Sequence, residues 1–546
     1  MHCFNAKDRG HLITKLADES YDCVIIGGGI TGAGIALDAI SRGLKTALLE
    51  KKDFASGTSS KSTKLVHGGL RYLKQFEIRL VREVGRERAV VHKLAPHLVK
   101  PEKMLLPLIE GGTYGKLLTS FGLMVYDVLA GVEKEDQRKM LTKEETLALA
   151  PDIRPDILEG GGIYAEYRTD DARLTVEIMK TAADLGADII NYAEVVDFEY
   201  QDGKISSILW KDHLEEEEHT IKSKYTISAA GPWVDQIREK NKSLYGKQLH
   251  PTKGVHIVVP HQRFPVKQAL YFDVEDGRMI FAIPRDRVTY IGTTDTDYLG
   301  DINNVRTDLC DVEYLIRGVN HIFPNIKLKV EDVESTWVGL RPLIQEEGKS
   351  ASELSRKDEI FESESGLLSI AGGKLTGYRK MAERIIDKIA KSESRQGREL
   401  PDCSTEGTIL TGGVFASSIE VDAYIDEIAD GLSEHNLAHM ANYLVSNYGK
   451  QTEEILRIFY DQKQGSKEIK LGMAELIFTV HREAVFTLLD FFERRTGRLY
   501  FNISSIDALI KPAIEYLSKE FGWSKDRQYS EKKELEQAIY LASHFN

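Results

Sequence analysis

The sequence predicts an α/β fold in which a parallel sheet carries an inserted antiparallel sheet and is followed by a helical C-terminal domain. Residues 21–27 and 44–50 are short apolar runs on either side of a helical pattern that extends to about residue 41, which is typical of the βαβ start of a parallel sheet. The strand-like runs VHIVVP, MIFAIP and VTYIG, between residues 255 and 292, predict the antiparallel sheet. Beyond a polar linker around residues 392–413 the pattern is mostly helical.

The remaining elements follow from spacing and turn signals. Residues 173–185 have apolar positions at helical spacing, and residues 187–192 predict a strand. The turn QDGK at 201–204 lies between two strand-like runs and predicts a hairpin. Residues 367–371 predict a last buried strand, followed by a helix over 374–392. One apolar helical stripe is predicted in the C-terminal part, formed by Val480, Ala484, Val485, Leu488, Leu489 and Phe492.

Composition excludes several classes of function. A formal net charge of −13 and a pI near 5.7 argue against nucleic acid as a partner, because phosphate binding needs a basic face. Cys3, Cys23, Cys310 and Cys403 form no C-x-x-C pair, which indicates neither a disulfide framework nor a zinc site and fits a reducing cytoplasm. The N-terminus lacks the apolar region of a secretory signal, and no apolar run approaches the ~18 residues of a membrane span. We therefore expect a cytoplasmic chain that is soluble or bound to a membrane surface.

A metal site is not expected either. Asp295 and Asp297 form a D-x-D pattern after a strand, which is usually structural, so no metal is assigned.

A nucleotide fingerprint occupies residues 27–32. It fits G-x-G-x-x-G between a strand and a helix: Gly27 permits the tight turn, Gly29 lets the backbone approach a pyrophosphate, and Gly32 allows close packing of helix on strand. The helix N-terminus then offers N–H groups to the phosphates. Glu50 ends the next strand at the ~20-residue distance expected of a ribose-binding acid, and it disfavours a 2′-phosphate. The fingerprint predicts a Rossmann-like dinucleotide site.

Two further segments favour FAD over NAD. Residues 227–233 (ISAAGPW) run from a strand into small residues, which lets the backbone pass close to a cofactor. Residues 371–374 (AGGK) again join a strand to a helix, whose N-terminus would stabilise the negative charge of a reduced flavin. We therefore predict a composite FAD-binding domain over residues 1–395, with an inserted antiparallel-sheet substrate-binding part at about 75–160 and 240–345. The helical C-terminal domain covers 396–546.

The segment SSKSTKLVHGGLRYL, at residues 59–73, carries the most specific resemblance. Together with the IIGGGITGAGIALDAISRG start, GLRPL at 339–343 and GGKLTGYRKMAE near residue 372, it resembles FAD-dependent glycerol-3-phosphate dehydrogenases of the aerobic type. The resemblance runs over nearly the whole chain. It implies oxidation of sn-glycerol 3-phosphate to dihydroxyacetone phosphate, with electrons passed from the flavin to a membrane quinone.

Such a substrate needs fixed cations near the flavin. Arg71, Arg341 and Lys374 lie in glycine-flanked segments close to the predicted cofactor edge; arginine suits bidentate phosphate recognition, and lysine acts as a point charge. The resemblance implies that these three residues, with Tyr72 and Thr376, form the phosphate and hydroxyl pocket.

The C2 hydroxyl must also lose a proton, and histidine is the usual base near neutral pH. His256 is the first candidate, and His67 is the second unless it contacts the flavin instead. Arg341 would stabilise the developing alkoxide. The predicted cofactor contacts are Gly27, Gly29, Ile30, Thr31, Gly32, Glu50, Ser59, Ser60, Thr63, His67, Val195, Gly231, Gly373, Lys374, Leu375 and Thr376.

A quinone acceptor requires docking on the inner face of the cell membrane. An arginine-rich helix over residues 71–93, with Arg79, Arg82, Arg86 and Arg88, and the apolar segment 117–130 are the two candidates for contact with lipid.

Three alternatives stay open: a glycerol-3-phosphate oxidase that reduces oxygen, an amine or amino-acid oxidase, and a non-catalytic flavin-binding module. Neither self-association to a homo-oligomer nor the role of the C-terminal domain is decided by any residue.

Overall fold

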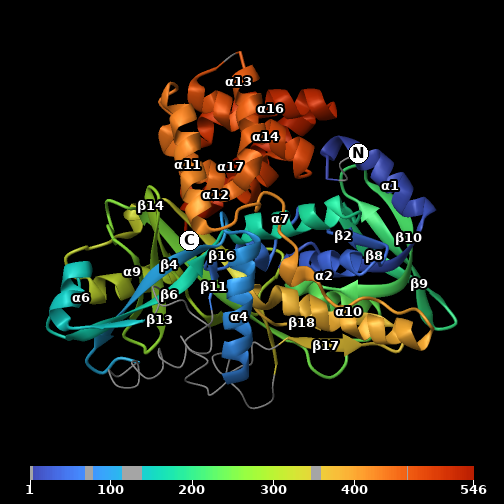
Figure 1. Cartoon of the computed structure of the whole chain (residues 1–546), viewed down its shortest axis with the longest axis horizontal. Helices are drawn as coiled ribbons and strands as arrows, with labels where there is room; N and C mark the ends of the chain where they lie inside the picture. The colour runs from blue at the N-terminus through green and yellow to red at the C-terminus, as the bar shows by residue number, and fades with distance from the viewer. Residues whose placement is uncertain (1–3, 68–77, 114–137, 346–357, 464, 546) are drawn as a thin grey trace.

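A computed structural model describes residues 4–67, 78–113, 138–345, 358–463 and 465–545. The predicted α/β fold is confirmed. Two sheets lie side by side, and the C-terminal helices stand above the region where they meet (Figure 1).

The first sheet, sheet A, has eight strands in the order β17-β18-β10-β1-β2-β7, with the hairpin β8–β9 attached to β10. Neighbours from β18 to β7 pair in parallel, and β17 is an antiparallel edge. Its strands are β1 (Ser20–Ile26), β2 (Thr46–Leu49), β7 (Asp188–Ile190), β8 (Ala193–Gln201), β9 (Lys204–Asp212), β10 (Glu217–Ser228), β17 (Glu359–Glu362) and β18 (Leu367–Ala371). The predicted βαβ start, the hairpin and the last buried strand are all confirmed.

Alternation along β1 explains why sheet A is covered on both faces. Cys23 and Ile25 belong to a core that includes the helices on one face, whereas Val24 and Ile26 pack with residues of β8 and β9 on the other. The helices of the first face are α2 (Ile30–Ser41), α7 (Asp171–Asp184) and α10 (Tyr378–Arg395). The predicted helix over 374–392 begins later than expected, because a 3₁₀ turn, η6 (Leu375–Gly377), precedes α10.

Sheet B, the inserted sheet, has ten strands in the order β15-β11-β14-β13-β12-β4-β6-β3; β16 pairs with β11, and β5 pairs with β6. All its pairings are antiparallel except β12–β4. Its strands are β3 (Leu65–Val66), β4 (Lys100–Ile109), β5 (Lys139–Leu141), β6 (Leu158–Arg168), β11 (Leu249–Pro260), β12 (Ala269–Asp273), β13 (Met279–Arg285), β14 (Val288–Gly292), β15 (Thr296–Asp297) and β16 (Ser335–Ile344). Helix α9 (Leu309–Ile322) packs its apolar side on this sheet.

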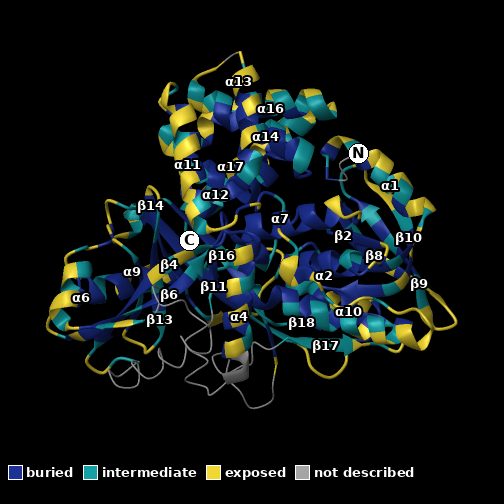
Figure 2. Ribbon diagram, in the orientation of Figure 1, coloured by how far each residue is buried: buried dark blue, intermediate teal, exposed yellow. Residues whose placement is uncertain are grey.

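The C-terminal part is helical, as predicted. Its elements are α11 (Ser418–Ser433), α12 (Ala441–Tyr448), α13 (Thr452–Asp461), α14 (Lys467–Arg482), a π-helix (Asp490–Arg495), α15 (Arg498–Phe501), α16 (Asp507–Phe521) and α17 (Lys525–Ser543). Figure 2 shows buried residues continuing from α7 into the lower ends of these helices. One hydrophobic cluster accordingly contains Ile25 of β1, Val176 of α7 and Leu476 of α14.

The prediction of a single apolar helix through residues 480–492 is wrong. Helix α14 ends at Arg482, and Ala484 has a φ of 48°, which breaks the helix. The reason is a buried charge: Glu483 leaves the helix to meet Arg173, whose guanidinium donates to both carboxylate oxygens at 2.5 and 2.8 Å. The apolar residues still share a core, but they reach it from the end of α14, from the turn after it and from the helical segment that follows.

Candidate active site

A deep cleft opens at the carboxyl ends of β1, β10 and β18, where parallel sheets of this kind bind ligands. Together with the open solvent at its mouth, it contains about 1320 Å³ of empty space. Of the predicted cofactor residues, its wall includes Gly27, Gly29, Ile30, Thr31, Glu50, Ser59, Val195, Gly231, Gly373, Lys374 and Leu375. Segments far apart in the sequence therefore meet in one cleft, at the place where such folds bind a dinucleotide.

Backbone conformation and close contacts explain why two positions of the fingerprint are occupied by glycine. Gly27 has a φ of 112°, and a Cβ there would lie 2.6 Å from the carbonyl oxygen of Ala229. A Cβ on Gly32 would lie 1.9 Å from the carbonyl oxygen of Gly27, so α2 can approach β1 this closely only with glycine at that position. Gly32 itself does not line the cleft.

Glu50 lies on the cleft wall and is buried. Its carboxylate accepts from the backbone N–H of Gly28 at 2.6 Å and from that of Lys52 at 2.9 Å. Burial raises the pKa of this carboxyl, and the two backbone donors oppose the shift. These bonds hold the acid beside the turn of the fingerprint.

Ser59 links the loop after β2 to the start of α2, because its hydroxyl accepts from the backbone N–H of Ile30 at 2.9 Å. Ser60 is buried behind the wall, and Thr63 faces His256. These two, like Gly32, His67 and Thr376, lie outside the cleft lining. Their predicted role as cofactor contacts stays a prediction.

Trp233 is a wall residue that was not selected from the sequence. The ammonium group of Lys51 lies 4.2 Å from the centroid of its ring, and the indole N–H donates to Asn303 at 2.8 Å. The ISAAGPW segment marked its neighbourhood, but nothing in the local pattern indicates that this side chain turns toward the cleft.

A second group of polar side chains lies on sheet B, where β11 and β16 run antiparallel. His256 and Arg341 come from these two strands. A Cβ on Gly254 would lie 2.4 Å from the Arg341 guanidinium, so this glycine lets Arg341 lie across β11. Arg341 donates to the Thr293 hydroxyl at 2.9 Å and forms an ion pair with Asp295 at 3.2 Å. The guanidinium is thereby fixed in orientation.

His256 is buried and stacks on Trp337, with ring centroids 4.7 Å apart. Its Nε2 lies 2.9 Å from the Thr63 hydroxyl, and its buried Nδ1 has no hydrogen-bond partner among the described residues. Burial, reinforced by the charges of Arg341 and Lys64, holds the pKa of His256 well below 6.5. The imidazole is therefore neutral at physiological pH.

The other predicted substrate residues lie on the cleft wall, next to it or outside the described residues. Lys374 lies on the cleft wall directly before η6, and the Thr376 hydroxyl donates to the carbonyl oxygen of His67 at 3.3 Å. His67 packs edge-on against Phe281. Arg71 and Tyr72 fall outside the described residues.

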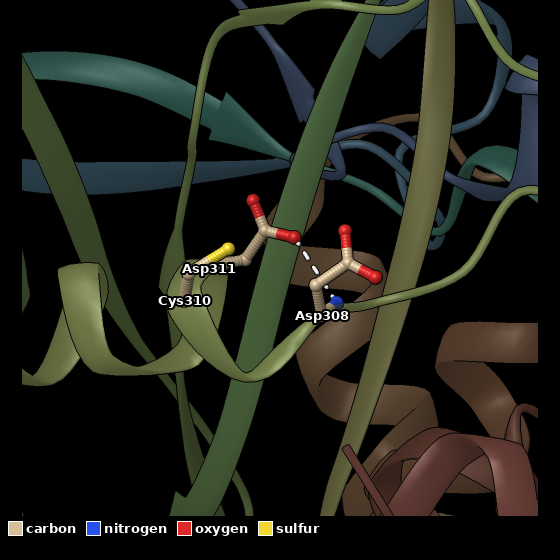
Figure 3. A group of neighbouring side chains, drawn as sticks. All are labelled: Asp308, Cys310 and Asp311. Atoms are coloured by element: carbon tan, nitrogen blue, oxygen red, sulfur yellow. Dashed lines mark hydrogen bonds between the residues drawn. The ribbon is translucent and has the colours of Figure 1, made fainter. Parts of the chain in front are cut away.

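The acidic residues that could suggest a metal are used in other ways. Asp295 pairs with Arg341, and Asp297 lies 2.6 Å from His250. Asp308, Cys310 and Asp311 gather at the start of α9, where the Asp311 carboxylate accepts from the Asp308 backbone N–H (Figure 3). Lys253 pairs with both carboxylates, at 2.5 and 2.7 Å. Capping and this lysine account for the group.

The predicted arginine-rich helix exists as α4 (Ile78–Leu94), but its arginines differ in exposure. Arg88 is buried and pairs with Glu166, so it is not available to lipid; this part of the prediction is wrong. Arg82 and Arg86 are exposed, and Arg86 pairs with Glu406. The segment 117–130 lies outside the described residues. Among the helices that the structure describes, none is long and apolar enough to cross a membrane.

Comparison with known proteins identifies the class. A family model described as FAD dependent oxidoreductase matches residues 22–379, and one described as the C-terminal domain of alpha-glycerophosphate oxidase matches residues 403–528. The fold and the cleft thus define a FAD-dependent oxidoreductase, and the prediction of FAD as cofactor is confirmed.

Close relatives narrow the class to one family. Aerobic glycerol-3-phosphate dehydrogenase of Bacillus subtilis is 46% identical over 99% of this chain and 98% of its own, and that of Staphylococcus aureus strain USA300 is 48% identical over 98% of each chain. The solved glycerol-3-phosphate dehydrogenase of Bacillus halodurans with FAD is 42% identical, covers 99% of both chains and has a TM-score of 0.85. The chain belongs to the family of aerobic, FAD-dependent glycerol-3-phosphate dehydrogenases, as its motifs predicted.

A more distant structure shares the fold alone. L-alpha-glycerophosphate oxidase of Mycoplasma pneumoniae is 19% identical with a TM-score of 0.57, and it covers 70% of this chain but 96% of its own. Nearly the whole of that protein therefore matches only part of this chain.

Proposed function

We propose that this chain oxidises sn-glycerol 3-phosphate to dihydroxyacetone phosphate and passes the electrons to a membrane quinone. The observation that carries the proposal is the match along almost the entire chain to relatives named aerobic glycerol-3-phosphate dehydrogenase. When bound, FAD supplies the hydride acceptor at N5. The residues of the chain have to bind the phosphate, orient the alcohol and take its proton.

Arg341 is the best-supported phosphate ligand. Its guanidinium is held by Thr293 and Asp295, so little side-chain freedom is lost when an anion binds. Lys374 on the cleft wall adds a second cation. The family resemblance implies Arg71 and Tyr72 as further phosphate ligands, and both lie outside the described residues. Fixed cations of this kind bind the substrate and also stabilise negative charge that develops on its C2 oxygen.

Proton removal runs through Thr63 to His256 in this proposal. The C2 hydroxyl donates to the Thr63 oxygen while the Thr63 hydroxyl donates to His256 Nε2, across the 2.9 Å that separates these atoms. The neutral imidazole is ready to accept, although burial and then the charges of Arg341 and Lys64 lower its pKa and weaken it as a base. A phosphate dianion bound at Arg341 offsets that positive field and makes His256 a stronger base when substrate is present. His67 is the second candidate for the base.

Oxygen is the rival electron acceptor. The C-terminal family model takes its description from an alpha-glycerophosphate oxidase, which favours a test of both acceptors. A quinone lies in the bilayer, so the dehydrogenase would dock at the inner face of the membrane, and the exposed Arg82 and Arg86 of α4 would face anionic lipid.

The test follows flavin absorbance in purified holoenzyme under anaerobic conditions. Addition of sn-glycerol 3-phosphate should bleach the flavin, and a short-chain quinone should restore it faster than air does. Rapid reoxidation by air with release of peroxide would establish an oxidase instead. A flavin that stays oxidised in protein retaining FAD would refute the substrate and favour an amine or amino-acid oxidase or a binding module. Arg341→Gln provides the site control, because it should raise KM for the phosphate substrate while FAD stays bound.

A further inference from the structure

The loop that joins β2 to β3, residues 51–64, forms one wall of the flavin cleft. We call it the cleft loop. Lys51, Ser56, Gly57, Thr58, Ser59 and Ser62 of this loop line the cleft. Near its end the loop also carries Thr63, the hydrogen-bond partner of His256. Its position therefore affects both the cofactor and the proposed proton path.

The C-terminal domain holds the start of the cleft loop through Asp53. This carboxylate is buried, and Arg495 donates to both of its oxygens at 2.8 Å, while Arg494 donates at 2.5 Å. Asn191 of the FAD-binding domain adds a donor at 3.1 Å. Although burial alone would raise it, the two guanidiniums hold the pKa of Asp53 below its ordinary value. The carboxylate is thus ionised, and two arginines of the π-helix form ion pairs with it.

A second anchor holds the end of the loop. The Lys61 ammonium donates to Glu493 and to the Tyr500 hydroxyl, and Tyr500 in turn donates to Glu493 at 2.6 Å. The Lys61 side chain is 20% exposed and that of Glu493 is 7% exposed, so water screens this pair weakly. On its other side, Lys61 packs directly against Gly339 of β16, the strand that carries Arg341.

A third, indirect contact runs through α7. Asp171 at the start of this helix accepts from the backbone N–H and the hydroxyl of Ser62, at 2.9 and 2.6 Å. Two residues further along α7, Arg173 is held by Glu483 of the C-terminal domain. The single stretch 483–500 thus reaches the cleft loop at its start, at its end and through the helix beneath it.

We propose that the C-terminal domain is a clamp that fixes the cleft loop in the shape that binds FAD, with Glu493, Arg494, Arg495 and Tyr500 as positioning residues. None of these four residues lines the flavin cleft. They act by raising the fraction of molecules whose loop is already in its binding conformation, and a lower fraction weakens apparent affinity in proportion. The proposal rests on FAD as cofactor and not on the identity of the substrate.

The test measures the dissociation constant of FAD, by quenching of flavin fluorescence, in the full-length protein without substrate. Lys61→Met and Glu493→Gln should each raise it roughly tenfold, as expected if about a tenth of the molecules keep the competent loop. The double variant should be little worse than either single one, because both remove the same contact. Lys61→Arg keeps a cation against Glu493 and should restore most of the affinity.

Glu475→Gln is the matched control. Glu475 is also buried, and it pairs with Arg498 inside the C-terminal domain rather than with a residue of the cleft loop. Its variant should lose thermal stability but keep FAD affinity within about twofold. The clamp is refuted if Lys61→Met leaves the dissociation constant unchanged, or if Glu475→Gln raises it as much as Glu493→Gln does. Cleavage of the cleft loop by protease in the FAD-bound protein is the second readout. It should accelerate in Lys61→Met and Glu493→Gln but not in Glu475→Gln, and equal cleavage in Lys61→Met and wild type would also contradict the clamp.

Discussion

The role of His256 could not be inferred from its residue type alone, because its surroundings in the folded chain set its pKa. The sequence marked it as a base because histidine titrates near neutral pH. In the folded chain it is enclosed between Trp337 and Thr63, and burial moves its pKa out of that range. The hydroxyl of Thr63 becomes as important as the imidazole, although the sequence marked this threonine only as a cofactor contact.

Thr63→Val tests this pair. The variant keeps the shape of the side chain but removes the hydroxyl that bridges to Nε2, so flavin reduction by sn-glycerol 3-phosphate should slow by about 10²–10⁴-fold. Stopped-flow absorbance under anaerobic conditions measures that step directly, and FAD content serves as the control. A reduction rate equal to that of the wild type would remove Thr63 from the proton path.

At the scale of elements, the βαβ start, the hairpin and several strands of both sheets were accessible from the sequence, because each carries its own apolar pattern or turn signal. The position at which α14 ends could not be predicted from the sequence. The apolar spacing around residues 480–492 continues without a break, and the helix stops because Glu483 pairs with Arg173, a residue 310 positions away. Contacts of this kind, like the anchors of the cleft loop, are decided by tertiary structure and leave no local signal.

Glu483→Gln should therefore destabilise the chain strongly. Glu483 also pairs with Lys180 at 2.9 Å, and its loss leaves two buried cations to share the single carboxylate of Glu177. Breaking a buried pair on one side costs about 3–5 kcal/mol of the free energy of unfolding. Urea unfolding followed by circular dichroism measures the loss; a change below about 1 kcal/mol would mean that the helix break is held by packing alone.

Helix α17 also carries a buried glutamate, and the pKa shift of this residue has a consequence for stability. Glu531 is buried against the Leu488 N–H, and burial raises its pKa to about 7, despite Arg527. Between the unfolded value near 4.5 and 7, the folded chain holds a proton that the unfolded chain has lost, so this group's contribution to stability falls as pH rises through that window.

Glu531→Gln should thus gain stability relative to wild type between pH 5 and pH 8, by at most about 3 kcal/mol. Melting temperatures of both proteins across this range test the sign. A difference that stays constant with pH would show that Glu531 does not titrate in the folded state.

At the scale of the whole molecule, the shared hydrophobic cluster, rather than the division into domains, determines how the chain unfolds. Because the core of β1 and α7 continues into α14, the catalytic part and the C-terminal helices should unfold together. Removal of FAD should lower the melting temperature of both by about 4 °C, the effect expected for loss of a ligand present at a thousandfold excess over its dissociation constant. Calorimetry should show one transition in both forms, whereas two separated transitions would contradict a common core.

The order of strands in sheet A has a consequence for synthesis. β1 begins at Ser20, but its neighbour β10 begins at Glu217 and β18 only at Leu367. At roughly 5–20 residues per second, a ribosome needs tens of seconds to travel from the first of these strands to the last. β1 lacks a partner on one side until β10 has been made, and β10 then lacks one until β18 follows; an unpaired edge of this kind invites aggregation. The nascent chain thus stays dependent on protection until the final third of its message has been translated.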